Sequence, residues 1–208
     1  MLIEKEKLKV KKREHPEIQA NYRHHMDYYH PPLLPMPDIP VCLHYGAYMV
    51  KRRHDVHTGI DLYTPKGSLV YAVEDGDIIC IRKFTGTSIG YDWWNETQNI
   101  DIEGYTGCLG YGEIEPDPQL KVGDIVKKGQ VIGKVIPVLK EDRGRAMSML
   151  HFSIHRHCFG DMIKAVENKS KENFYDLQID PTMLLIQMKH KADIIKIADS
   201  MRIEVAKI

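Results

Sequence analysis

The sequence predicts a mainly β protein of antiparallel strands, with an extended N-terminal arm and a short C-terminal helix. Three observations support this prediction. Short apolar or alternating runs recur between glycine-containing turns, which is typical of β-hairpins. Five prolines between positions 31 and 40 exclude a regular helix there and favour an extended chain. Close to the end of the chain, Ile194, Ile197, Ala198 and Met201 recur at helical spacing.

Length and composition limit which classes of protein this sequence can belong to. With 208 residues, 43% of them hydrophobic and 28% charged, the chain is long enough to bury a core and resembles ordinary globular proteins. Its 29 basic and 29 acidic residues balance, so no net field directs it to nucleic acid or to an anionic membrane. No apolar run approaches the length of a membrane span. The N-terminus is charged and lacks an apolar signal core, so we expect no cleaved signal peptide.

The four cysteines are widely separated, and no Cys-x-x-Cys pair occurs among them. We therefore expect buried free thiols at Cys42, Cys80, Cys108 and Cys158. A cysteine-based zinc cluster is not expected without paired spacing.

Residues 1–40 form the predicted arm. It begins with a charge run, continues with a His- and Tyr-rich stretch at positions 21–30, and ends in the proline segment. Two interpretations of the His-rich stretch stay open. It packs on another subunit, which we favour, or it folds over a metal cleft and supplies a fourth ligand.

The pattern between positions 41 and 157 is that of β-strands joined by turns, and glycine or proline marks most of the boundaries. The predicted strands are 41–50, 69–73, 78–81, 99–103 (half-buried), 108–114, two short segments within 122–133, and 149–157. A long loop over 85–97 holds both tryptophans, Trp93 and Trp94. They either wall a substrate groove or anchor the fold.

A metal site is the strongest chemical prediction. His57 and Asp61 are separated by three residues, and His151 is a distant third partner. Two imidazoles and a carboxylate suit zinc and leave a fourth position for water. If the chain is extended there, positions 57, 59 and 61 share one face, and Gly59 leaves room for an ion. The alternative is that the pair binds no metal and consists of a surface histidine beside a solvated carboxylate.

The strand predicted over 149–157 carries three histidines. Alternation places Met149, His151, Ser153, His155 and His157 on one face. At ~3.3 Å per residue, His155 lies roughly 13 Å from His151, too far to share one ion. His155 and His157 are therefore predicted to line a groove or to face solvent.

Several sequence blocks occur in an informative order: residues 57–78, 120–135, 150–154 and Asp180-Pro181. Together they resemble the lysostaphin/LytM-type zinc endopeptidases, which cut peptide cross-links in bacterial cell walls. The resemblance covers roughly residues 41 to 185, so the predicted organisation is an arm (1–40), a peptidase-like domain (41–185) and a C-terminal tail, expected to be helical (186–208). It implies an antiparallel β-sandwich of this peptidase kind and Zn²⁺ held by His57, Asp61 and His151.

Two positions depart from the family pattern. Both assisting histidines are replaced, one by Glu113 in the segment Tyr111-Gly-Glu113 and the other by Met149. Glu113 is the substitute we name as catalytic base, because a glutamate beside zinc can accept a proton from water. The predicted function is a zinc-dependent peptidoglycan endopeptidase, in which zinc-activated water attacks a cell-wall peptide bond.

Two alternatives stay open. The domain has lost catalysis and serves as a structural or wall-binding part of an assembly, or it is a β-domain without metal. Because no signal peptide is expected, we predict delivery by a phage particle, with the chain in the tail or baseplate; otherwise it is cytoplasmic. The expected partners are peptidoglycan peptides and other virion proteins, the latter bound through the arm and the tail, with no nucleic acid and no membrane span.

Overall fold

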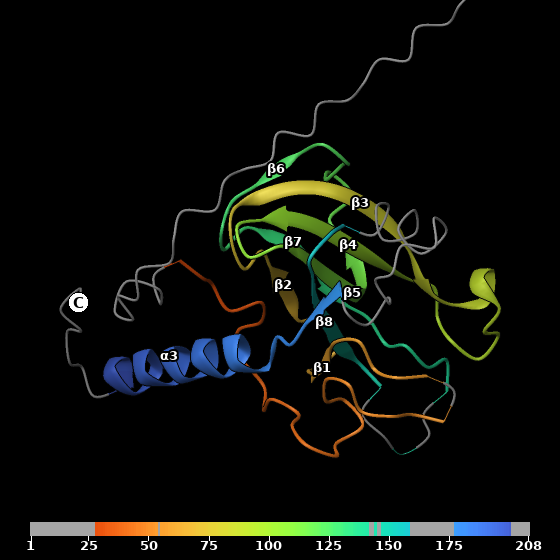
Figure 1. The fold of residues 1–208 in the computed structure, drawn as a ribbon, viewed down its shortest axis with the longest axis horizontal. Helices are drawn as coiled ribbons and strands as arrows, with labels where there is room; N and C mark the ends of the chain where they lie inside the picture. Colours follow the sequence, from red (N-terminus) through yellow and green to blue (C-terminus); the bar gives the residue numbers. More distant parts are fainter. Residues whose placement is uncertain (1–27, 54, 142–143, 145–146, 159–176, 201–208) are drawn as a thin grey trace, which may run out of the picture.

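The structure, a computed structural model, describes residues 28–53, 55–141, 144, 147–158 and 177–200. Within these ranges the chain forms a nine-stranded sheet, in which every strand pair is antiparallel, and one long helix near its C-terminal end (Figure 1). This confirms the mainly β, antiparallel fold class with a C-terminal helix. The elements are β1 (Ile60–Tyr63), β2 (Leu69–Tyr71), β3 (Gly76–Thr85), the 3-10 turn η1 (Thr87–Ile89), β4 (Thr97–Gly104), β5 (Cys108–Pro116), β6 (Ile125–Val126), β7 (Val131–Val135), β8 (Met149–His155), β9 (Gln178–Ile179) and α3 (Thr182–Ser200).

The strand order along the sheet is β1-β8-β5-β4-β3-β6, with β2 and β7 paired beside β5, and β9 beside β8. Strands β8 and β5 thus lie next to each other although they are far apart in the sequence. Their apolar side chains point to the same core, in which Tyr111 packs edge-on against Phe152 at a ring-centroid distance of 5.3 Å. The Tyr111 hydroxyl accepts a hydrogen bond from the Val73 backbone N–H at 2.9 Å. The opposite face of β8 and β5 is polar and carries the site described below.

The strand predicted over 41–50 is wrong. These residues form consecutive turns, and Cys42 and Met49 have φ angles of 57° and 56°, which an extended strand does not allow. Their alternating apolar residues are mostly exposed: Leu43 is 91% accessible to solvent and Tyr45 is 72% accessible. The segment instead contributes backbone carbonyl groups to the neighbouring site.

The remaining strand predictions are largely confirmed, with two differences. Strand β4 is buried on both faces rather than one, because Asn99 and Asp101 on its polar side are each only 1% exposed. The two short strands within 122–133 do not pair with each other: β6 pairs with β3, whereas β7 pairs with β2 and β5.

The described part of the predicted arm, residues 28–40, packs on its own domain. Leu33 is fully buried and forms a β-bridge with Val70, and Met36 is 6% exposed within the same core cluster. Leu185 and Met188 of α3 belong to that cluster as well. The described residues of the arm therefore contact the core of their own domain. Residues 1–27, which include most of the His-rich stretch, lie outside the described residues, so both interpretations of that stretch stay predictions.

Helix α3 begins at Thr182, before the predicted tail, and extends over 19 residues. The Asp180 carboxylate accepts a hydrogen bond from the Thr182 backbone N–H at 2.8 Å, which satisfies one of the free donors at the start of the helix. Within the described ranges, no helix combines the length and the apolar character that crossing a bilayer requires.

Two of the four cysteines form a disulfide, which corrects the expectation of four buried free thiols. Cys108 on β5 is bonded to Cys158, with a Cα–Cα distance of 5.2 Å. Cys42 is free and exposed, and Cys80 is free and partly exposed. Sequence spacing could not reveal the pair, because Cys108 and Cys158 meet only when β5 aligns Cys108 opposite His155 of β8. The bond ties the start of β5 to the chain just after β8.

Removing this disulfide should lower stability without unfolding the chain. The bond closes a loop across 50 residues of sequence, so we expect the double variant Cys108→Ala/Cys158→Ala to lose about 2–4 kcal/mol of unfolding free energy. Urea denaturation of the oxidised wild type and of the variant measures this loss. Cys42→Ala is the matched control, since its thiol is free. Equal midpoints for the double variant and the wild type would contradict the prediction.

Candidate metal centre

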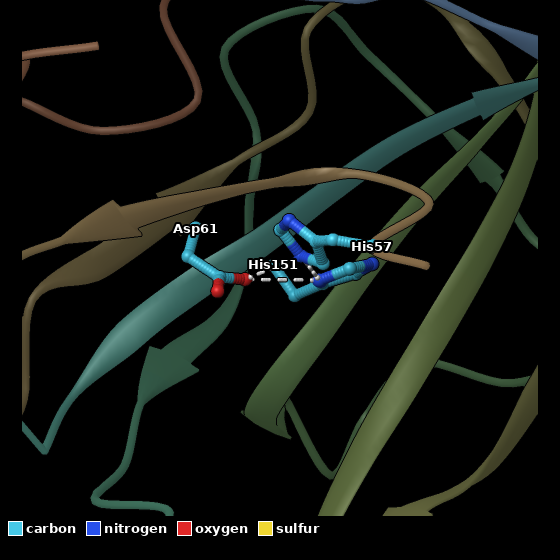
Figure 2. Close-up of side chains that lie close together, drawn as sticks. All are labelled: His57, Asp61 and His151. Carbon is cyan, nitrogen blue, oxygen red and sulfur yellow. Dashed lines mark hydrogen bonds and ion pairs between the residues drawn. The ribbon is translucent and has the colours of Figure 1, made fainter. Parts of the chain in front are cut away.

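The three predicted ligands converge on one point, as Figure 2 shows. His57 Nε2, Asp61 Oδ1 and His151 Nδ1 form a triangle in which all three atom pairs are 3.0 Å apart. The exposed fractions of the three residues are 3%, 4% and 8%. Because buried polar groups of this kind require partners, the cluster is a built feature of the fold rather than a surface coincidence.

The donor set and its geometry fit a zinc ion. Ligands that surround zinc tetrahedrally at ~2.0–2.1 Å lie about 3.3 Å from one another. The observed 3.0 Å triangle is therefore close to the size of a three-ligand zinc face. Two imidazole nitrogens and one carboxylate oxygen are also the donor types that catalytic zinc sites use while keeping a position open for water.

The sheet register brings the ligands together. Asp61 on β1 is directly opposite His151 on β8, so the two side chains leave the same face of the sheet. His57 enters from the turn before β1, and its Nδ1 is 2.8 Å from the Ala47 carbonyl oxygen. With its proton on Nδ1, His57 donates to that carbonyl and presents the Nε2 lone pair to the ion.

Gly59 is needed for close packing rather than for space around an ion. A Cβ atom at this position would lie 2.6 Å from His151 Nε2 and 2.7 Å from the Phe152 carbonyl oxygen. The absent side chain thus makes room for the His151 ring. Phe84 packs on the same ring at a centroid distance of 5.2 Å and fixes its orientation.

Asp61 is held as a carboxylate. Burial alone would raise its pKa, but hydrogen bonds and charge interactions with His151 and His57 outweigh burial and lower the pKa. Arg52 also pairs with the second oxygen, Oδ2, and donates to the Tyr45 carbonyl oxygen. Burial lowers the pKa of His151, which favours the neutral, metal-binding form of its ring. Asp61 can thus offer Oδ1 to an ion while Oδ2 remains paired with the Arg52 guanidinium.

Glu113 lies on a β-bulge beside the ligands. On β4 one residue separates Gln98 from Ile100, whereas on β5 two residues, Gly112 and Glu113, separate their partners. Glu113 has a φ of 63°, which is unusual for a residue with a side chain and costs free energy. Bulges of this kind re-aim a side chain and are found next to active sites.

The Glu113 carboxylate faces the charged groups of the site. Its Oε2 atom is buried and has no hydrogen-bond partner among the described residues. Burial raises its pKa, the nearby Asp61 carboxylate raises it further, and Arg52 opposes both. Met149, the second replaced position, lies opposite Tyr63 in the β1–β8 pair and offers no hydrogen-bond donor.

Three residues of the site were not singled out from the sequence: Arg52, Tyr63 and Phe84. Arg52 is five positions before His57, and Tyr63 is two positions after Asp61, so strand alternation could have placed Tyr63 on the ligand face. No local signal indicates Phe84, because it reaches His151 only through the order of strands in the sheet.

The polar face continues along β8 beyond the ligands. His155 is 8% exposed, which corrects its prediction as a groove or solvent residue; its Nε2 is 2.9 Å from the Ser153 hydroxyl. His157 is exposed, as expected. His155 is not a member of the ligand cluster, in agreement with the distance argument.

The tryptophan loop after β3 is built around Tyr91. Tyr91 stacks on Trp94 at a centroid distance of 4.4 Å and contacts Trp93 edge-on at 6.0 Å. Trp94 forms a bridge with Leu139, whereas Trp93 is 52% exposed. Trp94 thus has an anchoring contact, whereas about half of the Trp93 surface is exposed to solvent.

Comparison with protein-family models gave one match. The family model described as Peptidase family M23 matches residues 55–165, which is more than half of the chain and includes all three ligands. A comparison with curated proteins gave no match.

Two solved structures share the fold, and a third gives a partial match. The protein cbpa from L. salivarius REN is similar, with a TM-score of 0.51 and 19% identity over 79% of this chain and 99% of that one. The antimicrobial peptidase lysostaphin from Staphylococcus simulans has a TM-score of 0.50 and 18% identity over 78% of this chain and 56% of that one. Csd3 of Helicobacter pylori matches at 24% identity and a TM-score of 0.39, over 58% of this chain and 29% of that one. In the matches described, this chain spans 29% of the Csd3 chain and 56% of the lysostaphin chain.

The ligand cluster predicts metal binding that depends on His151. The purified wild type should retain about one zinc per chain after dialysis, and His151→Ala should retain almost none, because two remaining ligands hold zinc weakly. Elemental analysis of both proteins measures this. His190→Ala, an exposed histidine on α3, is the control and should keep its zinc. Equal zinc in all three proteins would exclude this cluster as the site.

Because His155 is buried, we expect the free energy of unfolding to decrease as the pH is lowered. Burial lowers its pKa to about 4, assisted by the charges of His151 and Arg82, from about 6.5 in an unfolded chain. The folded state therefore binds fewer protons in this interval, so stability is complete above pH 6.5 and falls as the pH drops towards 4. The loss approaches ~3 kcal/mol at pH 4, since each pKa unit corresponds to about 1.4 kcal/mol.

Chemical denaturation of metal-free wild type and His155→Gln between pH 7 and pH 4 isolates this contribution. The variant lacks the titrating ring, so its unfolding free energy should fall less steeply than that of the wild type. Parallel pH profiles would contradict the assignment.

Proposed function

This chain belongs to peptidase family M23, and we propose that it is a zinc-dependent peptidoglycan endopeptidase in which Glu113 acts as the catalytic base. The observation that carries the proposal is the zinc-sized triangle of His57, Asp61 and His151. The partly buried Glu113 carboxylate beside it, whose Oε2 atom is buried, supports hydrolysis rather than a purely structural ion, since a structural site needs no adjacent base.

A zinc ion held by the three ligands would polarise the scissile carbonyl group and lower the pKa of a water molecule. Glu113 then accepts the proton of the attacking water at Oε2, the atom that has no other hydrogen-bond partner in the described part of the chain. The same carboxyl group returns the proton to the amine nitrogen as the C–N bond breaks.

Arg52 supports this chemistry indirectly. By pairing with Asp61 Oδ2, it fixes the carboxylate orientation so that Oδ1 faces the two imidazoles. Its positive charge also favours the ionised form of Glu113, the form that a base requires.

Replacing Glu113 should separate metal binding from catalysis. We expect Glu113→Gln to lose at least about 100-fold in the rate of peptidoglycan digestion, since the amide cannot accept the proton, and to keep one zinc per chain. Release of soluble fragments from purified peptidoglycan, together with elemental analysis, measures both quantities. Glu115→Gln is the matched control, because Glu115 is exposed on the same strand and pairs with Lys134. Full activity of Glu113→Gln would exclude it as the base.

The second candidate function is a domain that binds zinc or cell wall within an assembly and does not cut. The replacement of a histidine by Met149, which offers no donor, favours this candidate. A wild type that holds one zinc but releases no fragments would support it. Absence of zinc would favour the metal-free β-domain.

The place of action is a separate proposal. Disulfides persist mainly outside the cytoplasm, so the Cys108–Cys158 bond supports action in an oxidising compartment, where peptidoglycan is also found. Delivery by a phage tail or baseplate, with contacts to other virion proteins, stays a prediction from the sequence. Detection of the chain in purified phage particles would support it, and confinement to the bacterial cytoplasm would contradict it.

A further inference from the structure

Peptide hydrolysis at this site needs a hydrogen-bond donor for the oxygen of the scissile carbonyl, because negative charge develops on that oxygen as water adds to the carbon. Among the groups around the ligands, Glu113 and Asp61 are acceptors. The Arg52 guanidinium directs Nε and Nη2 to Asp61 Oδ2 and to the Tyr45 carbonyl oxygen, so these two nitrogens already have acceptors. Met149 has no polar hydrogen. Within the described residues, the hydroxyl group of Tyr63 is an uncharged donor that stands among these groups.

Tyr63 lies on the ligand face of β1. It is two residues after Asp61, and strand alternation directs both side chains to the same side. Gly46 shows how close the two are: a Cβ atom on Gly46 would lie 3.1 Å from Asp61 Cβ and 3.1 Å from the Tyr63 hydroxyl oxygen. The phenol also interacts electrostatically with Asp61, Arg52 and Glu113, and so stands among the charged groups of the site.

The position of the Tyr63 ring is fixed by the turn that precedes the ligands. His44 accepts a hydrogen bond from the Gly46 backbone N–H at 3.0 Å and packs edge-on against the Tyr63 ring at a centroid distance of 5.7 Å. Within the described part of the chain, no hydrogen bond engages the Tyr63 hydroxyl. A half-buried phenol that is held in place at a charged site and keeps its donor unused is suited to a ligand.

We propose that Tyr63 is a further catalytic residue, whose hydroxyl donates a hydrogen bond to the carbonyl oxygen of the scissile peptide while water adds. This rests on the proposed peptidase function. The proton stays on Tyr63 throughout: water oxygen bonds to the carbonyl carbon, Glu113 receives the water proton and passes it to the amine, and the C–N bond breaks. Tyr63 thus supplies the donor that Met149, directly opposite in the strand pair, does not have.

The test compares Tyr63→Phe with the wild type and with Tyr71→Phe. The substitution removes the hydroxyl group and keeps the ring against His44. Tyr71 is a matched control, since it is also half-buried but lies on β2 outside the ligand cluster. We expect Tyr63→Phe to digest purified peptidoglycan about 10–100-fold more slowly, with unchanged zinc content and melting temperature, while Tyr71→Phe keeps the full rate.

A second readout does not depend on turnover. Inorganic phosphate is a tetrahedral oxyanion, and its affinity for the zinc-loaded proteins can be measured by titration calorimetry. We expect several-fold weaker phosphate binding by Tyr63→Phe than by the wild type or Tyr71→Phe. Equal digestion rates, or equal phosphate affinities, for Tyr63→Phe and the wild type would overturn the role of Tyr63. If the wild type itself digests nothing, the peptidase proposal fails, and phosphate affinity still decides whether the hydroxyl serves an oxyanion.

Discussion

The pairing of β1 with β8 is the constraint on which the rest of the site depends. It sets Asp61 opposite His151, and a shift of one residue would turn either side chain to the apolar core. The core prevents such a shift, because Leu150, Phe152 and Leu62 alternate with the ligands and are fully buried. The same alternation that builds the hydrophobic core therefore aligns the metal ligands, so stability and site geometry have one origin.

Several charged side chains lie close together around this strand pair, and most of their charges are paired with neighbouring groups. Asp61 shares its two oxygens between the imidazoles and Arg52, so that neither oxygen is left without a partner. Glu113 is the exception: a bulge with a strained backbone directs its carboxylate there, and among the described residues its buried Oε2 atom has no hydrogen-bond partner. A buried carboxylate oxygen without a partner and a positive φ both reduce stability, so their coincidence beside the candidate ligands supports a role in chemistry.

Elements outside the central strands restrain the same region. The Cys108–Cys158 disulfide links β5 and the end of β8, the two strands that carry Glu113 and His151. The turns over 41–50, although not a strand, direct the Gly46 and Ala47 carbonyl oxygens to Asp61 and His57. Leu33 and Met36 instead complete the core next to β2 and α3, away from the ligands. The extensions and turns thus have distinct structural tasks.

Sequence alone predicted the antiparallel β class, most strand positions and the three residues of the candidate metal site. Alternation and glycine-marked turns are local properties, and the resemblance to the zinc endopeptidases selected the three donors. The sequence did not determine the turns at 41–50, the burial of His155, the disulfide or the contact of Phe84 with His151. Each depends on which strands become neighbours. The position of Tyr63 and the bulge at Glu113 were likewise not predictable from the sequence. The sequence shows the residue type, but strand register decides whether its side chain lies near Asp61, and only long-range packing fixes that register.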